Sequence, residues 1–106
     1  MKHIDLQNLE PREIMPGFLG RMVHSDNMTF VHWEIKAGSP LPEHSHMHEQ
    51  VVNVIEGQFE LIVAGEAQTL GPSEVACIPS NALHSGKAIT DCYIIDVFYP
   101  IREDYR

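Results

Sequence analysis

Short segments of alternating apolar and polar residues dominate the chain after residue 20. Residues 27–38, NMTFVHWEIKAG, alternate in this way and are rich in β-branched and aromatic residues, which is typical of a β-strand. The segments that follow are VVNVIEG, QFELIVAG, AQTLG, EVACIP and CYIIDVFYP, each bounded by Gly, Pro, Ser or Asn. No stretch after residue 20 keeps a 3.6-residue apolar period, so we expect no long helix. The pattern predicts an all-β sandwich or barrel.

The chain of 106 residues is long enough for one hydrophobic core, and no linker or low-complexity segment divides it. We therefore expect a single domain over residues 1–106. Its barrel core is predicted at about residues 21–100, after an irregular N-terminal segment over residues 1–18. The sequences EGQFE, at residues 56–60, and AGEAQ, at residues 64–68, predict two tight hairpin turns.

Composition and charge exclude several kinds of partner. The formal net charge is −8 and no basic stripe is present, which argues against nucleic acid and against anionic membrane surfaces. No apolar leader and no membrane-length run is visible, so a cytoplasmic location is the default expectation. The two cysteines, Cys77 and Cys92, lie in apolar runs and are interpreted as two buried, reduced thiols.

A histidine-rich segment at residues 43–50, EHSHMHEQ, carries the first candidate chemistry. His44, His46, His48 and Gln50 occupy every second position. On a strand, side chains two residues apart share a face at roughly 7 Å, so two imidazoles can reach one metal ion. Gln50 would lie about 20 Å from His44 on a straight strand, so it joins the same ion only if the chain bends between Met47 and Glu49. The alternative is a solvated histidine-rich loop without a metal.

His84 is the next histidine along the chain, and it follows the strand EVACI and a Pro-Ser-Asn turn. A single histidine in a turn is usually only exposed, so the spacing of the surrounding motifs decides its interpretation. Gly38, five residues, His44-Ser-His46, three residues, Gln50, six residues and Gly57 follow the first motif of the cupins, with Gln in place of Glu. Gly71, Pro79-Ser80-Asn81 and His84 resemble their second motif, although Asn81 replaces Gly and Ala88 replaces the final Asn.

The resemblance to the cupins implies a double-stranded β-helix, or jelly-roll, barrel that is usually dimeric. It also implies a divalent metal ion, such as Zn, Ni, Mn or Fe, bound by His44, His46, Gln50 and His84, with His48 beside the ligands. Gln50 is neutral, so the ion would keep its full double charge and act as a stronger Lewis acid. Oxygen activation generally favours an anionic ligand, so Gln50 shifts the expectation from redox chemistry toward polarising an oxygen ligand.

The C-terminal segment CYIIDVFYPIREDYR holds further candidates. On a strand, Asp96 would lie on the same face as Ile94 and Phe98, which are two residues away on either side. A carboxylate among apolar residues is costly to bury without a partner. It is either an ion-paired or barrel-end residue, or a general acid/base facing the metal pocket. Arg102, after Pro100, is either an exposed tail residue or a two-pronged carboxylate binder that crosses the barrel mouth.

The tail also resembles a narrower group, the small pectin-degradation cupins, which linearise 4,5-unsaturated uronates. The shared residues are the segment from His44 to Gln50, Asp96-Val-Phe98, Pro100 and Arg102-Glu103-Asp104. The resemblance implies that Asp96 transfers protons and that Arg102 holds the carboxylate of an anionic sugar acid. Phe98 would pack the pocket wall, and Gln58 and Tyr99 would make further substrate contacts.

Two other functions remain open from the sequence. One is a cupin-type metal dioxygenase acting on a small organic substrate, which would need bound iron or copper. The other is a non-catalytic cupin that binds a metal or a small ligand. The net charge of −8 does not steer an anionic substrate inward, so binding of a uronate would depend on the local charge of the metal and Arg102.

Overall fold

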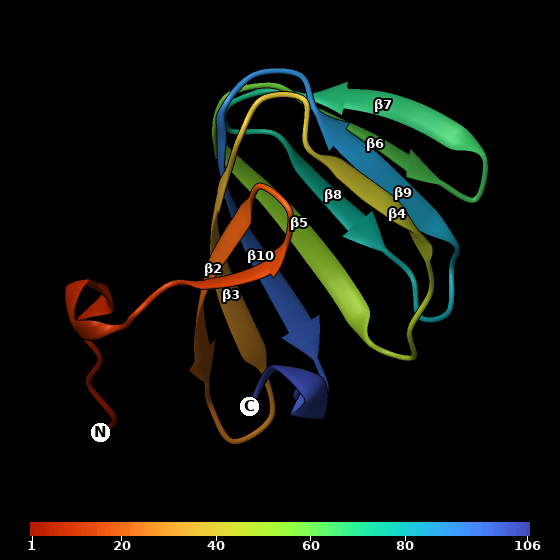
Figure 1. The fold of residues 1–106 in the computed structure, drawn as a ribbon. Helices are drawn as coiled ribbons and strands as arrows, with labels where there is room; N and C mark the ends of the chain where they lie inside the picture. The colour runs from red at the N-terminus through yellow and green to blue at the C-terminus, as the bar shows by residue number, and fades with distance from the viewer.

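A computed structural model describes residues 1–106 and contains ten β-strands and two 3-10 helices (Figure 1). The elements are, in order, η1 (Leu6–Asn8), β1 (Arg12–Met15), β2 (Phe18–His24), β3 (Thr29–Ile35), β4 (Pro40–His44), β5 (Glu49–Glu56), β6 (Phe59–Val63), β7 (Glu66–Leu70), β8 (Val75–Ile78), β9 (His84–Ala88), β10 (Cys92–Tyr99) and η2 (Glu103–Tyr105).

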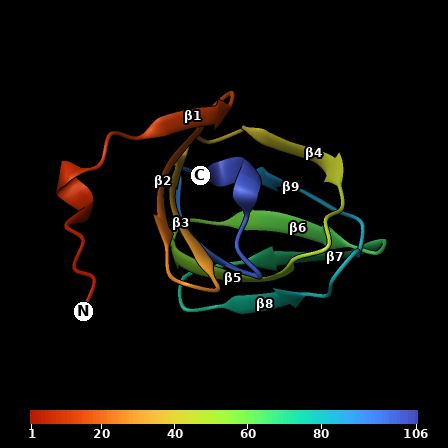
Figure 2. The same cartoon turned by 90° about the horizontal axis from the view of Figure 1, so that it is seen from below.

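The strands form two antiparallel sheets that face each other. One sheet has six strands in the order β1-β2-β3-β10-β5-β8, and the other has four in the order β4-β9-β6-β7. Viewed from below, the strands enclose a barrel, and the C-terminal helix η2 lies over its open end (Figure 2). The all-β fold expected from the short alternating segments is therefore confirmed, and so is the jelly-roll that the resemblance to the cupins implies.

The core lies between the two sheets because inward residues alternate along the strands. In β3 the buried positions Val31, Trp33 and Ile35 alternate with residues that face outward, and in β10 Ile94 and Phe98 do the same. Trp33 fits against β2 because residue 20 there is glycine. A Cβ atom at that position would lie 2.7 Å from the indole ring. The largest side chain of the core thus depends on the absence of a side chain on its neighbour.

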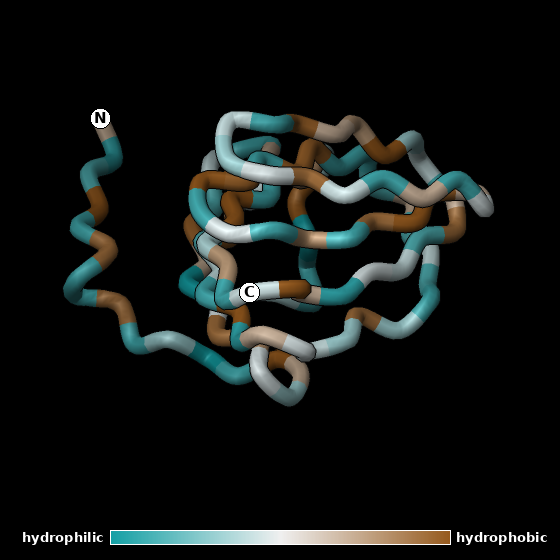
Figure 3. The backbone as a smooth tube through the Cα atoms, turned by 90° about the horizontal axis from the view of Figure 1, so that it is seen from above, coloured by the Kyte–Doolittle hydropathy of each residue, from teal (hydrophilic) through white to brown (hydrophobic).

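The barrel begins earlier in the chain than we expected. Residues 12–15, within the stretch predicted to be irregular, form β1, and β2 starts at Phe18, which is part of the core. A four-residue strand is too short for its alternation to be recognised in the sequence, and its position is determined by pairing with β2. Residues before β1 run outside the barrel, as the N-terminal part of the backbone tube in Figure 3 shows.

One of the two predicted hairpins is confirmed and the other is wrong. Strands β6 and β7 pair through a two-residue turn in which Ala64 and Gly65 both have positive φ, as tight hairpins require. In contrast, residues 56–60 carry the chain from β5 in the six-stranded sheet to β6 in the four-stranded sheet. Gly57 turns the chain there with a φ of 90°. A short turn between sheets and a hairpin turn use the same residue types, so the sequence does not distinguish them.

The prediction of two buried thiols is correct only for Cys92. Cys77 is exposed because β8 is the edge strand of its sheet and residues 75 and 77 face away from the core. The two cysteines are both free. None of the helices has the length and apolar character that a membrane crossing requires. The expected cytoplasmic location stays a prediction.

Candidate functional site

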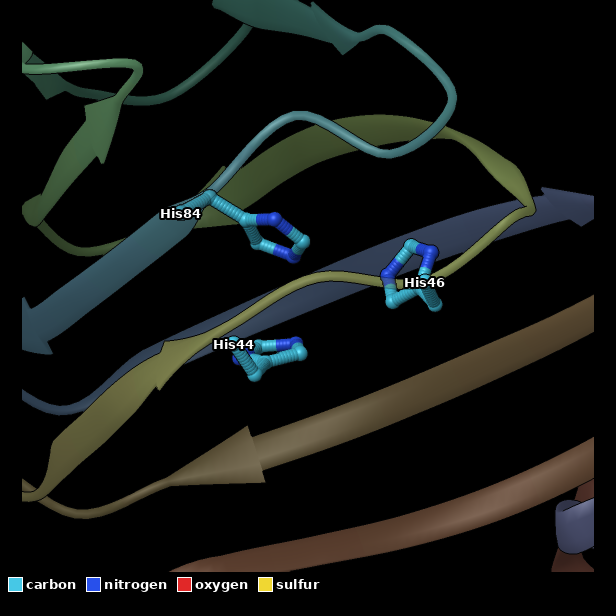
Figure 4. A group of neighbouring side chains, drawn as sticks. All are labelled: His44, His46 and His84. Carbon is cyan, nitrogen blue, oxygen red and sulfur yellow. The ribbon is translucent and has the colours of Figure 1, made fainter.

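Three imidazoles converge at one end of the barrel (Figure 4). His44 is the last residue of β4 and His84 is the first residue of β9, and the two are paired across the sheet. His46 comes from the link between β4 and β5. One nitrogen atom from each ring lies within 4.8 Å of those from the other two. Residues 40 positions apart are thus brought together by one strand pair and one loop.

The structure corrects how the histidine-rich segment is arranged. His44 and His46 were expected on one strand, but β4 ends at His44 and the chain bends at Met47 and His48 before β5 begins. The bend predicted between Met47 and Glu49 is therefore present. It places Gln50 Oε1 3.1 Å from His46 Nε2.

The turn before β9 holds this bend in place. The main-chain N–H of Asn81 donates to the carbonyl of His46 at 2.8 Å, and the Ser80 hydroxyl donates to the carbonyl of Met47 at 2.5 Å. Asn81 has a φ of 66°, a left-handed conformation that asparagine adopts more readily than most residues. The two sequence motifs are therefore joined directly through main-chain contacts.

The hydrogen bonds of the three imidazoles determine which nitrogen is free. The Nδ1 atoms of His44, His46 and His84 lie 2.9, 3.0 and 2.9 Å from the carbonyl oxygens of Pro42, His48 and Ala82. A carbonyl only accepts, so each Nδ1 carries the proton and each Nε2 keeps a lone pair.

The unprotonated Nε2 atoms fit a cation, and that of His46 also lies beside Gln50 Oε1. His84 Nε2 is buried and has no hydrogen-bond partner, which is costly unless something binds there. Nδ1–H donation to a carbonyl with Nε2 left bare is the usual arrangement of metal-binding histidines. The donor set therefore fits a divalent metal ion held by imidazole nitrogens.

Burial favours the neutral form of two of these imidazoles, His46 and His84. Burial lowers the pKa of His46 to about 4, and the nearby positive charges of Arg102 and His84 add to the effect. Burial likewise lowers the pKa of His84, with further contributions from His44 and Arg102. Metal binding requires neutral imidazole, so near neutral pH this site binds a cation without first releasing protons from His46 and His84.

Gln50 and His48 lie beside the three imidazoles. Gln50 is 5% exposed and pairs with Phe98 of β10 and Ile78 of β8. Its amide oxygen is the fourth candidate ligand. The main-chain oxygen of His48 accepts the hydrogen bond from His46, while the His48 ring lies 3.2 Å from the carbonyl of Ile101. His48 thus links the loop that carries His46 to the C-terminal segment.

A cavity lies inside the barrel next to the imidazole cluster. It encloses about 480 Å³ of space between the atoms, part of it open to solvent. Its polar lining residues are His44, Gln50, His84, Asp96 and Arg102, and most of the others are apolar. The cavity therefore brings three of the four predicted metal ligands, His44, Gln50 and His84, into one space with a carboxylate and a guanidinium.

Asp96 lies at the wall of this cavity and is 8% exposed. The indole N–H of Trp33 donates to its Oδ2 at 2.9 Å, and Oδ1 has no hydrogen-bond partner of normal geometry. Burial raises the pKa of Asp96 to about 6, against the opposing effects of the Gln50 amide, Trp33 and Arg102. A buried carboxyl with a free oxygen and a pKa near neutrality is suited to proton transfer.

Other predicted substrate contacts divide into two groups. Phe98 is 2% exposed and lines the cavity, and Arg102 lies with its guanidinium 4.9 Å from the centre of the Phe98 ring. Gln58 and Tyr99 do not line it: Gln58 lies in the turn between the sheets, and Tyr99 is 58% exposed at the end of β10.

Two residues near the site were missed in the sequence. The sequence pattern marks Trp33 only as a strand residue, yet its indole N–H donates to Asp96 from across the β3–β10 pair. Tyr105 packs against the core and lines the cavity. The alternation of residues along β3 indicates that Trp33 faces inward. Nothing in the sequence indicates that the C-terminal residues around Tyr105 fold back over the barrel.

Replacing Trp33 by Phe should raise the pKa of Asp96 further. The change retains an aromatic ring beside Phe18 and Tyr105 but removes the only hydrogen bond to Asp96 Oδ2. Since a hydrogen bond to a charged group contributes about 1.5–3 kcal/mol, we expect an upward shift of roughly one unit or more. Carboxyl NMR chemical shifts across a pH titration measure it. An unchanged or lower pKa would contradict the role given to the indole N–H.

Comparisons with known proteins agree with this geometry. A family model described as "Cupin domain" (Cupin_2) matches residues 31–98. The "Pectin degradation protein KdgF" of Dickeya dadantii (strain 3937) is 28% identical over 83 residues, 76% of each chain.

Two solved structures are similar over the whole chain. KdgF from Halomonas sp. is 25% identical, with a TM-score of 0.94 over 100% of this chain and 99% of that one. An RmlC-like cupin from Shewanella frigidimarina NCIMB 400 is 27% identical, with a TM-score of 0.93 over 100% of this chain and 97% of that one. Because the family model covers well over half of the chain, and because the two-sheet barrel and its histidine cluster agree with it, this protein belongs to the cupin family.

Proposed function

We propose that this protein opens the ring of 4,5-unsaturated uronates, converting the cyclic sugar acid to its open-chain keto form. The observation that carries the proposal is that Asp96 and Arg102 share one cavity with His44 and His84, two of the three convergent imidazoles. Similarity to the pectin degradation protein of D. dadantii and to KdgF of Halomonas sp. supports the same substrate class. The proposed partner is thus a small, anionic sugar acid.

The proposed cofactor is a divalent ion such as Zn, Ni, Mn or Fe, held by His44, His46, Gln50 and His84. Once bound, it would supply a full double charge that polarises a substrate oxygen, because all four candidate ligands are neutral. The low pKa values of His46 and His84 support this assignment, since both rings are ready to coordinate near neutral pH. Gln50 is buried beside them and adds no negative charge.

Asp96 performs the proton transfers in this proposal. Its free carboxylate oxygen takes the proton of the anomeric hydroxyl, the carbonyl forms at C1, and the bond between C1 and the ring oxygen breaks. The electron pair of that bond passes to the ring oxygen, which is joined to the C4–C5 double bond, and a proton then adds at C4. Atoms and electrons balance without an oxidant, so the net reaction is an isomerisation.

Arg102 and Phe98 orient the substrate in this proposal. The guanidinium binds the uronate carboxylate, since it presents paired donors that match a carboxylate. The apolar wall around Phe98 excludes water from the reacting centre, which strengthens the electrostatic interactions there.

The direct test is an assay with metal-loaded protein and an unsaturated galacturonate. The conjugated enol–carboxylate chromophore is destroyed by ring opening, so ultraviolet absorbance should fall faster than in a protein-free blank. Proton NMR should show the open-chain keto product in equal amount. A metal-loaded protein that does not accelerate the loss of absorbance would sink the proposal.

The rate should depend on pH through Asp96. Below its pKa the carboxyl is protonated and cannot accept the anomeric proton, so kcat/KM should rise with pH and then level off. The pKa is raised to about 6 by burial, and a bound cation would lower it, so we expect the midpoint at or below about 6. A profile of kcat/KM from pH 4 to 9 measures this. A rate that begins to rise only above pH 7 would contradict the role of Asp96 as the base.

The dioxygenase alternative has less support from the site. No carboxylate oxygen joins the cluster of imidazole nitrogens, whereas oxygen activation generally favours an anionic ligand. A binding protein without catalysis would not need a buried carboxyl with a raised pKa, so that alternative leaves Asp96 unexplained.

The homodimer expected from the family resemblance is also a proposal, and sedimentation measurements would test it. The exposed Ile55 and Val75 side chains on the outer face of the six-stranded sheet are compatible with it.

A further inference from the structure

The guanidinium of Arg102 is restrained by the C-terminal segment on several sides. Its carbon lies 4.9 Å from the centre of the Phe98 ring and 4.2 Å from that of the Tyr105 ring. Its Nε–H and one Nη2–H donate to the two carboxylate oxygens of Asp104, at 3.0 and 2.7 Å. The aromatic contacts restrict its plane, and the carboxylate restricts its rotation within that plane.

This arrangement leaves one edge of the guanidinium available. Arginine has five N–H donors, and the pair with Asp104 uses the edge formed by Nε and Nη2. The side-chain hydrogen bonds of Arg102 are the two to Asp104, so Nη1 and the second hydrogen of Nη2 form a free edge. Arg102 lines the same cavity as Asp96 and His84 and is only 12% exposed. A second carboxylate can therefore be bound by the free edge while Asp104 keeps the first.

Asp104 is not what holds the C-terminal segment to the barrel. The main-chain N–H of Arg102 donates to the Thr29 hydroxyl at 2.9 Å, and Arg12 donates to the Tyr105 carbonyl at 3.1 Å. The Tyr105 ring also packs edge-on against Trp33. Asp104 itself is 58% exposed, so its ion pair is screened by water and adds little to stability. Its contact with Arg102 therefore points to orientation of the guanidinium rather than to folding.

We propose that Asp104 is a positioning residue: by holding the Nε/Nη2 edge of Arg102, it presents the Nη1/Nη2 edge to the cavity as the receptor for the substrate carboxylate. The inference rests on the proposed function only in naming that carboxylate as the uronate carboxylate. Asp104 does not touch the substrate. Its effect passes through Arg102, and it should act on substrate binding more than on the chemical step.

The test compares Asp104→Asn with Glu103→Gln in metal-loaded protein. Glu103 is adjacent and also carries a carboxylate, but its ion pair is with Arg106 at 3.6 Å on the surface and not with the guanidinium of Arg102. Both variants remove one negative charge, and only the first weakens the hold on the guanidinium. We expect KM for the unsaturated uronate to rise about tenfold in Asp104→Asn with kcat nearly unchanged, as the loss of one ordered, charge-assisted contact implies. Glu103→Gln should match the unaltered protein.

A substrate without the carboxylate charge separates orientation from general damage. With the methyl ester of the uronate, the unaltered protein and Asp104→Asn should have the same KM. A lower KM in Asp104→Asn would mean that Asp104 competes with the substrate for Arg102, and that result overturns the inference. The inference is also overturned if Asp104→Asn has the same KM for the uronate as Glu103→Gln. It is overturned too if its KM for the methyl ester rises as much as its KM for the uronate.

Calorimetric binding of saturated galacturonate, which cannot undergo the ring opening, distinguishes failure of the inference from failure of the proposed function. Weaker binding by Asp104→Asn, in a protein that leaves the unsaturated uronate unchanged, would refute the proposed reaction and support the inference. Turnover of the unsaturated uronate, together with equal binding of saturated galacturonate by the unaltered protein and Asp104→Asn, would support the proposed reaction and refute the inference. No binding of either uronate to the unaltered protein would refute both.

Discussion

Asp96→Asn is expected to lower kcat by about 10²–10⁴, the usual contribution of a positioned general base, while the protein still binds its metal. The amide has nearly the shape of the carboxyl but cannot accept the anomeric proton. Asp96 is not among the clustered nitrogen ligands, so metal content should not change. Steady-state kinetics and elemental analysis of the same preparation measure the two effects together.

The same substitution should make the protein more stable. Burial raises the pKa of Asp96 from 3.8 to about 6, so the folded state binds this proton more tightly than the unfolded chain. The favourable contribution is fully present below pH 3.8 and is lost as pH rises to about 6. At pH 7 the ionised carboxyl therefore opposes folding by roughly 3 kcal/mol, and the neutral amide removes that penalty.

Chemical denaturation at pH 7 and at pH 4 provides the control. A gain in the free energy of unfolding at pH 7 that disappears near pH 4, together with the loss of kcat, would be specific to a buried carboxyl kept for chemistry. Full activity in Asp96→Asn would refute its role in proton transfer. Lower stability at pH 7 would contradict the raised pKa.

His46→Ala is expected to lower the affinity for a divalent ion by at least about a hundredfold and to reduce turnover to the uncatalysed rate. Changes beside metal ligands already cost about 10–100-fold, and this change removes a ligand itself. His46 is only partly buried and lies in a loop, so the barrel should fold without it. Titration of zinc into metal-free protein, followed by calorimetry, measures the affinity.

His32→Ala is the matched control for that experiment. His32 is also a partly buried histidine, but it lies on β3 beside Tyr93, with the two side chains 3.3 Å apart, and is not part of the imidazole cluster. Its removal should leave zinc affinity and turnover unchanged. Equal zinc affinity in His46→Ala and His32→Ala would show that the cluster is not the metal site.

The residues that could be predicted from the sequence are those whose placement follows from strand alternation. The period of β10 placed Asp96 and Phe98 on the same inward face, and both line the cavity. The requirement that Gln50 reach the same ion as His44 predicted the bend before β5, because a straight strand is too long. Spacing and strand geometry were sufficient in these cases.

The remaining features depend on contacts between distant segments. Trp33 and Asp96 are 63 residues apart and meet only because β3 and β10 pair antiparallel. Arg102 is enclosed by Tyr105 because η2 folds back over the barrel, which short C-terminal residues do not indicate by period or composition. Cys77 was misplaced for a related reason, since only the sheet order shows that β8 is an edge strand.

The central claim is that His44, His46, Gln50 and His84 form a divalent metal site, and elemental mass spectrometry of the untagged protein tests it most directly. The protein should be purified without a histidine tag, analysed as isolated, and analysed again after exposure to Zn, Ni, Mn and Fe followed by removal of unbound metal. The account predicts about one divalent ion per chain in at least one of these preparations. A protein that retains no metal in any of them would contradict it.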